Sequence, residues 1–127
     1  MQLEPFVSVN GLPFTASRED VLRLHGKPLQ EGFNVVGLIE LDYGSTVFRF
    51  QTSGRLEEVT QQAAMVDLGA AVVPFEALHR HVRHHDLGLF ERAGFVVSPR
   101  FGLAFDPASH RWVTALAAHC LDEWRAL

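Results

Sequence analysis

Histidines are the side chains of this sequence with the most evident capacity for chemistry. From His79 to His85 the sequence reads H-R-H-V-R-H-H. If this segment is helical, His81 and His85 lie four residues apart and face one direction, so that their ring nitrogens can share one divalent ion. That arrangement is half of a metal site. A small metal-binding protein, or a hydrolase that uses the His79–His85 cluster, is therefore one hypothesis for the function.

The histidine pair lacks the further ligands that a metal centre requires. A third ligand would have to come from Asp86, His110, His119 or Glu76, and nothing in the sequence places these residues. Position 82 is Val, so the H-E-x-x-H pattern of zinc hydrolases is absent. The plainer interpretation is a solvated helix face of basic character. A polar contact surface for a partner is the remaining alternative.

Cys120 is the only cysteine, which excludes an intramolecular disulfide and a zinc site built from paired cysteines. As a nucleophile it would need a base. Its neighbour His119 would point about 100° away on a helix and could not easily activate it. A buried thiol in the core is the simpler prediction.

Acidic side chains form a second candidate site. Glu40 and Asp42 share the outward face of a predicted strand, and Glu57 and Glu58 follow in a later one. Two carboxylates can divide general acid and base roles if a cleft lies above them. On an open antiparallel sheet they form instead a solvated face, with Arg49 as their cross-strand counter-charge.

Composition narrows the function classes. The chain has 127 residues, 47% of them hydrophobic, which predicts one globular domain over residues 1–127. The net charge of −4 argues against nonspecific nucleic-acid binding. The glycines follow neither nucleotide-binding motif, so no cofactor is expected. No secretion signal and no apolar stretch near 20 residues is found, which favours a cytoplasmic protein without a membrane partner.

The first half predicts a helix followed by a meander. Ser17 with Asp20 resembles a capping box, and Gly26 and Pro28 end the helix. Two strands follow, with Gly44 at the hairpin between them; their predicted ranges are 35–43 and 46–51. In the first of these strands Val35, Gly37, Ile39, Leu41 and Tyr43 are predicted to face inward. Residues 55–60 form a third strand and residues 64–68 a fourth.

The second half predicts a helix, a hairpin and a long helix. Pro74 begins the first helix, in which Phe75, Leu78 and Val82 recur at helical spacing. Residues 95–105 form the hairpin. In residues 111–125 the apolar residues Trp112, Leu116, Cys120 and Trp124 fall four apart. The predicted fold class is α+β, an antiparallel meander sheet with helices packed on one face and a long C-terminal helix.

A faint internal repeat accompanies these patterns. Residues 12–14 and 73–75 both read apolar-Pro-Phe before a predicted helix and hairpin, 61 residues apart at Phe14 and Phe75. Two matched tripeptides are too common at helix starts to establish a duplication.

Several of these segments resemble a known kind of small domain. The segments are 17–21, 26–28, 41–44, 48–50 and 54–56, about a third of the chain. They look like those of helix-then-meander domains such as beta-lactamase inhibitor proteins, small lipoproteins of outer-membrane assembly and several bacterial immunity proteins. The resemblance implies protein binding through a sheet face or loop. The chain lacks the lipid-anchoring cysteine and the disulfides of some of these proteins, which implies action in the cytoplasm.

The leading hypothesis is therefore a cytoplasmic immunity or inhibitor protein that neutralises a partner toxin or enzyme by occlusion. The expected contact residues are Glu40, Asp42, Arg49, Glu57 and Glu58, facing a basic rim on the partner. The alternatives are the metal site at His81 and His85 and a structural, oligomerising domain with aromatic residues near its C-terminus. The protein itself is expected to be a monomer or a homodimer.

Overall fold

A computed structural model describes residues 1–127 as an α+β fold of short helices and antiparallel sheets. The helices are α1 (Arg18–His25), α2 (Phe75–His85) and α3 (Cys120–Arg125). The strands of the main sheet are β4 (Gln30–Phe33), β5 (Ile39–Asp42), β6 (Thr46–Phe50), β7 (Leu56–Gln62), β10 (Phe90–Arg92), β11 (Phe95–Ser98), β12 (Leu103–Phe105) and β13 (Trp112–Leu116). Two small sheets contain β1 (Leu3–Glu4), β2 (Ser8–Val9) and β3 (Leu12–Pro13), and β8 (Met65–Asp67) and β9 (Val72–Pro74). None of the helices has the length and apolar character needed to cross a membrane.

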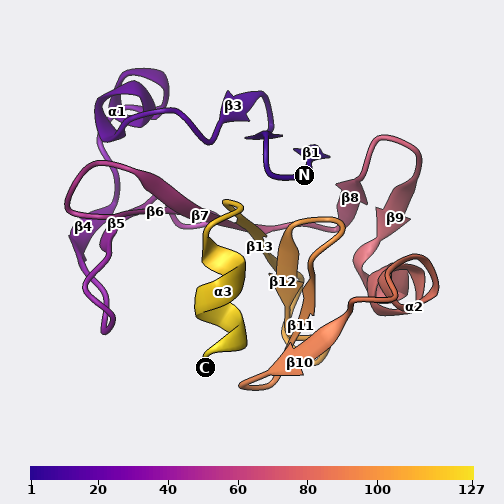
Figure 1. The fold of residues 1–127 in the computed structure, drawn as a ribbon. Coiled ribbons are helices and arrows are strands. Elements are labelled where there is room, and N and C mark those ends of the chain that lie inside the picture. The colour runs from indigo at the N-terminus through magenta and orange to yellow at the C-terminus, as the bar shows by residue number, and fades with distance from the viewer.

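The main sheet has eight strands in the order β10-β11-β12-β13-β7-β6-β5-β4. Its outer strands bend toward the side on which α3 lies, while α1 lies on the other side (Figure 1). Side chains on the α1 side form the larger core, in which Leu41, Phe48, Phe105 and Val113 are buried with Val21 of α1. α2 packs against the same core, since the rings of Phe75 and Phe105 meet edge to face.

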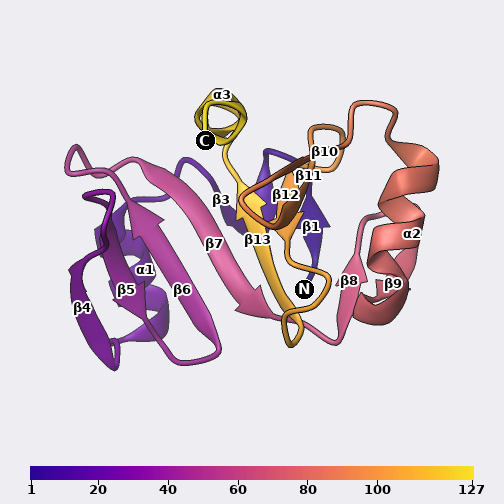
Figure 2. The ribbon, with the colours of Figure 1, turned by 90° about the horizontal axis from the view of Figure 1, so that it is seen from below.

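The two halves of the chain repeat one order of elements. A short hairpin, a helix and a four-stranded meander occur first as β2–β3, α1 and β4–β7, and then as β8–β9, α2 and β10–β13. The last strands of the two meanders, β7 and β13, pair antiparallel at the middle of the sheet, with Thr60 opposite Thr114 at the centre of the ladder (Figure 2). Because the equivalent strands β7 and β13 pair antiparallel, the two halves are related by an approximate twofold axis.

The predicted long C-terminal helix is wrong. Residues 112–116 are strand β13, and α3 begins only at Cys120. Arg111 has φ of +65°, which a helix cannot continue through, and β13 is paired on both edges, with β12 and β7. Most of this strand is buried on both faces, so its continuous apolar run matches helical spacing as well as strand spacing.

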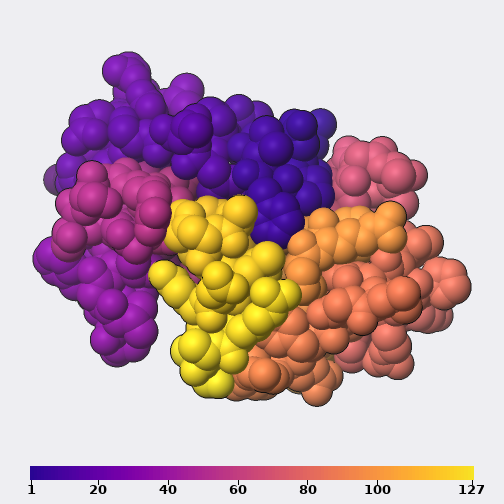
Figure 3. All heavy atoms as spheres, in the orientation of Figure 1, coloured from indigo at the N-terminus to yellow at the C-terminus, as the bar shows by residue number.

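The helices also do not all pack on one face of the sheet. α3 lies opposite α1, where Cys120 packs with Val97, Ala104 and Leu116 in a second, smaller core. Figure 3 shows the C-terminal residues, in yellow, seated between the strands of the first half and those of the second.

In the first half the structure confirms the α1 capping box and the Gly44 turn. Ser17 Oγ accepts from the Asp20 N–H, and the Asp20 carboxylate accepts from the Ser17 N–H. Gly44 has φ of +92°, and the Tyr43 N–H donates to the Thr46 carbonyl at 2.9 Å. The prediction for residues 35–43 is wrong at its start, because the strand begins only at Ile39 and Val35 is fully exposed.

Two strands are additional to the predictions, and one further predicted strand needs correction. β4 (Gln30–Phe33) and β10 (Phe90–Arg92) are strands for which the sequence patterns gave no prediction. The strand predicted over residues 64–68 exists as β8, but it pairs with β9 rather than with the meander. The helix predicted from Pro74 and the hairpin of residues 95–105 are confirmed as α2, β11 and β12.

Candidate functional site

Three of the acidic residues expected to contact a partner, Glu40, Asp42 and Glu58, lie on the α3 side of the sheet. Glu40, Arg49 and Glu58 are cross-strand neighbours on β5, β6 and β7. Arg49 Nε donates to Glu40 Oε2 at 2.7 Å, and Arg49 Nη1 donates to Thr60 Oγ1 at 2.6 Å and reaches Glu58 Oε2 at 3.5 Å. The predicted role of Arg49 as the counter-charge of this face is therefore confirmed.

Glu58 lies where this ladder meets α3. Burial raises the pKa of its carboxyl, and the positive charge of Arg49 partly opposes that rise. Trp124 Nε1 of α3 donates to Glu58 Oε1 at 3.3 Å. One edge of the acidic face is thus closed by the C-terminal helix, and the part over β5 and β6 is left open.

The side of the sheet that faces α3 is polar in the first half and apolar in the second. One row of paired residues crosses all eight strands: Gln30, Asp42, Val47 and Thr60 in the first half, then Thr114, Ala104, Val97 and Phe90 in the second. The second half of the row is mainly apolar and packs under α3. The corresponding part of the first half is mainly polar and has no helix over it, as Figure 2 shows.

Glu57 does not belong to this face. The pairing of β6 with β7 shifts between Arg49 and Phe50, so that Glu57 is an extra residue in β7. Its side chain is only 1% exposed and points to the segment that enters α3. Its expected role as a surface contact is therefore wrong, because a partner could not reach it.

The most exposed apolar group of the molecule is the tip of the β4–β5 hairpin. Phe33 is 71% exposed, Val36 is 72% exposed and Val35 is fully exposed. Asn34 fixes the shape of this tip, since its Oδ1 accepts from the N–H groups of Val36 at 3.1 Å and Leu38 at 2.9 Å. The hairpin projects from the end of the sheet (Figure 1).

A shallow hollow of about 390 Å³ lies at the base of this hairpin. It is lined by Gln30, Glu31, Gly32, Phe33, Glu40 and Asp42. Asp42 has no ion-pair partner, whereas Glu40 is paired with Arg49 and Glu31 with Arg18. An apolar tip with a negatively charged base is therefore presented at one edge of the sheet.

The structure places His81 and His85 side by side on α2, with ring centroids 4.4 Å apart. Burial and the neighbouring histidines lower the pKa of His81. Asp86, one of the ligands considered for this pair, is occupied elsewhere: it accepts from the Ser98 hydroxyl at 2.6 Å and from the Arg100 N–H at 3.0 Å. No third acidic, histidine or cysteine ligand joins the pair.

A different cluster brings three metal-ligating side chains together. Glu57, His119 and Cys120 place one ligand atom each within 4.8 Å of one another. Cys120 Sγ donates to Glu57 Oε2 at 2.8 Å, and His119 Nε2 forms a hydrogen bond with the same oxygen. Burial and the Glu57 carboxylate raise the pKa of the Cys120 thiol, so the thiol is protonated here and is no nucleophile. The prediction of a buried thiol is confirmed.

No protein family, curated protein or solved structure matches this chain.

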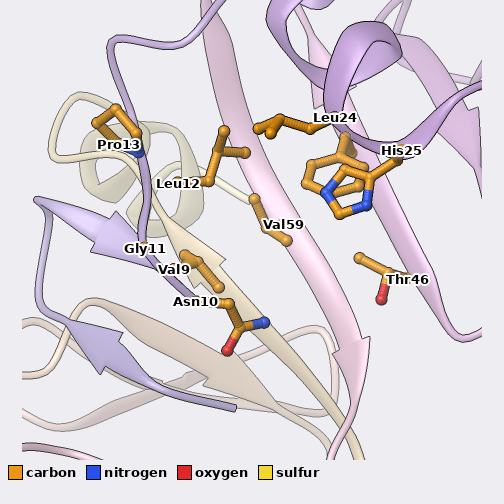
Figure 4. A pocket seen from close by; sticks show the side chains of 10 residues that line it. Val9, Asn10, Gly11, Leu12, Pro13, Leu24, His25, Thr46 and Val59 are labelled. Carbon is orange, nitrogen blue, oxygen red and sulfur yellow. The ribbon is translucent and has the colours of Figure 1, made fainter.

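A second hollow, with a more apolar wall, lies on the α1 side, between the β2–β3 hairpin, α1 and strands β6 and β7 (Figure 4). Its volume is about 390 Å³, and Leu12, Leu24 and Val59 contribute to its wall. The Asn10 amide at its rim is already used, since it donates to Gln61 Oε1 and accepts from the Gln2 N–H, each at 2.7 Å. This hollow is a seam between packed elements, and His25 and Thr46 are the other polar side chains that line it.

Sequence reasoning missed the hairpin tip and the Glu57 cluster. Asn34 followed by two valines and Gly37 is a signal for the tip, because Asn and Gly favour turns. The cluster had no such signal, since Glu57 lies 62 residues from His119 and meets it only through strand pairing.

Proposed function

We propose that this protein is a protein-binding module of the immunity or inhibitor type, which occludes a toxin or enzyme with the β4–β5 hairpin. The observation that carries the proposal is the exposed apolar tip at Phe33, Val35 and Val36. Apolar side chains held in water contribute nothing to folding, and clusters of them mark interaction sites.

Preorganisation of the tip supports this role. Asn34 Oδ1 accepts two hydrogen bonds at the tip. Two main-chain hydrogen bonds add to them: the Asn34 N–H donates to the Leu38 carbonyl at 2.9 Å, and the Gly37 N–H donates to the Asn34 carbonyl at 3.1 Å. A loop already held in one shape loses little conformational entropy when it binds. Phe33 then serves as the aromatic anchor that enters an apolar pocket of the partner.

Charge defines the kind of partner. On the open sheet face over β5 and β6, Glu40 and Asp42 supply two negative charges and Arg49 one positive charge, which leaves one negative charge beside the hairpin. Such a face accelerates association with a positively charged rim and disfavours acidic partners. The partner is thus a protein with an apolar cleft bordered by Lys or Arg, as expected for the active site of an enzyme that acts on an anionic substrate.

The experiment is capture from an extract of the source organism, followed by pairwise measurement with the purified partner. The double variant F33S/V35S is compared with the wild type, and L87S is the matched control, because Leu87 is fully exposed at the far end of the sheet. The double variant is expected to weaken binding at least about 30-fold, equivalent to about 2 kcal/mol, and L87S to leave it unchanged.

Inhibition and charge supply the second readout. Saturating wild-type protein is expected to block the activity of the partner, and the variant E40K/D42K to slow association more than it speeds dissociation. Equal binding by the wild type and F33S/V35S would refute the hairpin as the contact element. A bound partner that keeps its full activity would refute occlusion.

A further inference from the structure

We propose that Glu57, His119 and Cys120 form a binding site for one thiophilic divalent cation, with zinc as the preferred ion. The donors are a carboxylate oxygen, an imidazole nitrogen and a thiol sulfur, all within 4.8 Å of one another. Zinc accepts this mixture of ligands, whereas calcium and magnesium prefer oxygen alone. The site is independent of the hairpin that carries the proposed function.

Rigid main chain positions the three ligands. Glu57 is the extra residue of the β7 bulge, and its carbonyl oxygen accepts from the Ala117 N–H at 2.9 Å and from Cys120 Sγ at 3.4 Å. His119 and Cys120 are adjacent residues, and their ligand atoms lie within 4.8 Å of one another. The Glu57 carboxylate lies between them and receives hydrogen bonds from both.

In the metal-free protein, hydrogen bonds connect the three side chains that would bind the cation. The Cys120 thiol donates a hydrogen bond to Glu57 Oε2, and His119 Nε2 forms a hydrogen bond with the same oxygen. On binding, the thiol proton passes to solvent and the sulfur becomes a thiolate, while His119 binds as the neutral imidazole with its proton on Nδ1, so that Nε2 presents a lone pair. One Glu carboxylate and one thiolate then balance the two charges of the cation.

An outer partner and an entry path complete the site. Arg55 contacts Glu57 Oε1 at 3.3 Å, which orients the carboxylate and leaves Oε2 toward His119 and Cys120. His119 is 31% exposed and borders a hollow of about 360 Å³ that also contacts Phe6 and Phe14. Of the three proposed ligands only His119 lines this hollow, so the ion would enter past the His119 ring, and a water molecule from the hollow would be the fourth ligand.

A cation here would tie α3 to β7, across the joint between the two halves of the sheet. Its role is therefore structural. We expect zinc to raise the melting temperature of protein previously freed of metal with a chelator, and to do so at one ion per chain.

The test is titration of the metal-free chain with Co²⁺ and with Zn²⁺. Cobalt is expected to give a thiolate-to-metal absorption band, and zinc to displace it. C120S is expected to abolish the band. R55Q removes only an outer partner of the site and is expected to lower the zinc affinity by roughly 10- to 100-fold. H119Q removes a ligand and is expected to lower the affinity by more than R55Q does. H110Q is the matched control, and circular dichroism verifies that each variant is folded.

The histidine pair on α2 offers the competing site, and the variant H81Q/H85Q separates the two. The proposal expects this variant to retain the cobalt band and the zinc-dependent melting shift. Absence of both signals in the wild type would overturn the proposal. So would zinc binding that survives in H119Q and C120S but disappears in H81Q/H85Q.

Discussion

The side-chain oxygens of Thr60 and Thr114 lie 2.8 Å apart at the central residue pair of the β7–β13 ladder. Arg49 Nη1 donates to Thr60 Oγ1 at 2.6 Å, and the Thr60 hydroxyl is in turn hydrogen-bonded to the Thr114 hydroxyl, either of which can be the donor. The joint between the two halves of the sheet is therefore connected to the charged ladder of the first half. Thr114 is buried, which makes the end of this chain of hydrogen bonds sensitive to substitution.

T114V tests this connection. Valine has nearly the shape of threonine but cannot form the hydrogen bond with the Thr60 hydroxyl, so we expect a loss of about 1 kcal/mol in the free energy of unfolding. A double-mutant cycle with T60V, measured by urea unfolding, isolates the coupling between the two hydroxyls. Additive effects of T60V and T114V would show that the two hydroxyls contribute independently.

Val35 and Leu41 were expected on one inward face, and the structure separates them. Leu41 is fully buried and Val35 fully exposed. We expect L41A to destabilise the protein by about 2–5 kcal/mol and V35A by less than about 0.5 kcal/mol, as measured by thermal or urea unfolding. A large effect of V35A would contradict the exposed hairpin tip on which the proposed function depends.

The sequence was sufficient to predict those features of the fold that depend on a few neighbouring residues. The capping box at Ser17 and the Gly44 turn depend on a few adjacent residues, and both are found. Strand β13 could not be predicted in this way. Its apolar residues satisfy helical spacing, and only pairing with β7 and β12, distant in sequence, decides between strand and helix.

The candidate sites follow the same division. Glu40 and Asp42 could be placed on an outward face because strand alternation is a local property. The exposure of the tip at Val35 could not be predicted, because apolar residues such as valine are typical of a core. Glu57 was misplaced because the bulge that turns its side chain inward is a property of strand pairing.

D20N tests the electrostatics of the α1 cap. Hydrogen bonds from Ser17, with a smaller contribution from the charge of Arg23, lower the pKa of Asp20 below its ordinary value of 3.8. Because the folded pKa is lowered, this stabilisation is present above pH 3.8 and is lost as the pH falls through the folded pKa. We expect the stability difference between wild type and D20N to be constant near neutral pH and to shrink in acid. Urea unfolding at a series of pH values measures it, and a difference that grows in acid would contradict the cap.

Cys120 reactivity tests the burial of the metal-ligand cluster in the metal-free protein. The side chain is 1% exposed, and burial raises the pKa of its thiol, so both access and thiolate formation are suppressed. We expect a thiol reagent to label the native chain at least about 30-fold more slowly than the chain in urea, equivalent to an opening free energy of about 2 kcal/mol. The variant A118C/C120A is the control, because position 118 is exposed and is expected to react rapidly. Equal rates for the two native proteins would show that α3 does not cover the cluster.

Amide hydrogen exchange distinguishes the strand β13 from the helix that the sequence favours. Val113, Thr114 and Ala115 lie in a strand paired on both edges at the centre of the sheet, whereas α3 is a terminal helix of six residues. Opening β13 requires separating the two halves of the sheet, but α3 can open alone. We therefore expect amides in β13 to exchange at the rate of global unfolding and those after Cys120 to exchange faster. Uniform protection from residue 112 to residue 125 would instead indicate one continuous helix and would remove the joint on which the twofold arrangement of the halves depends.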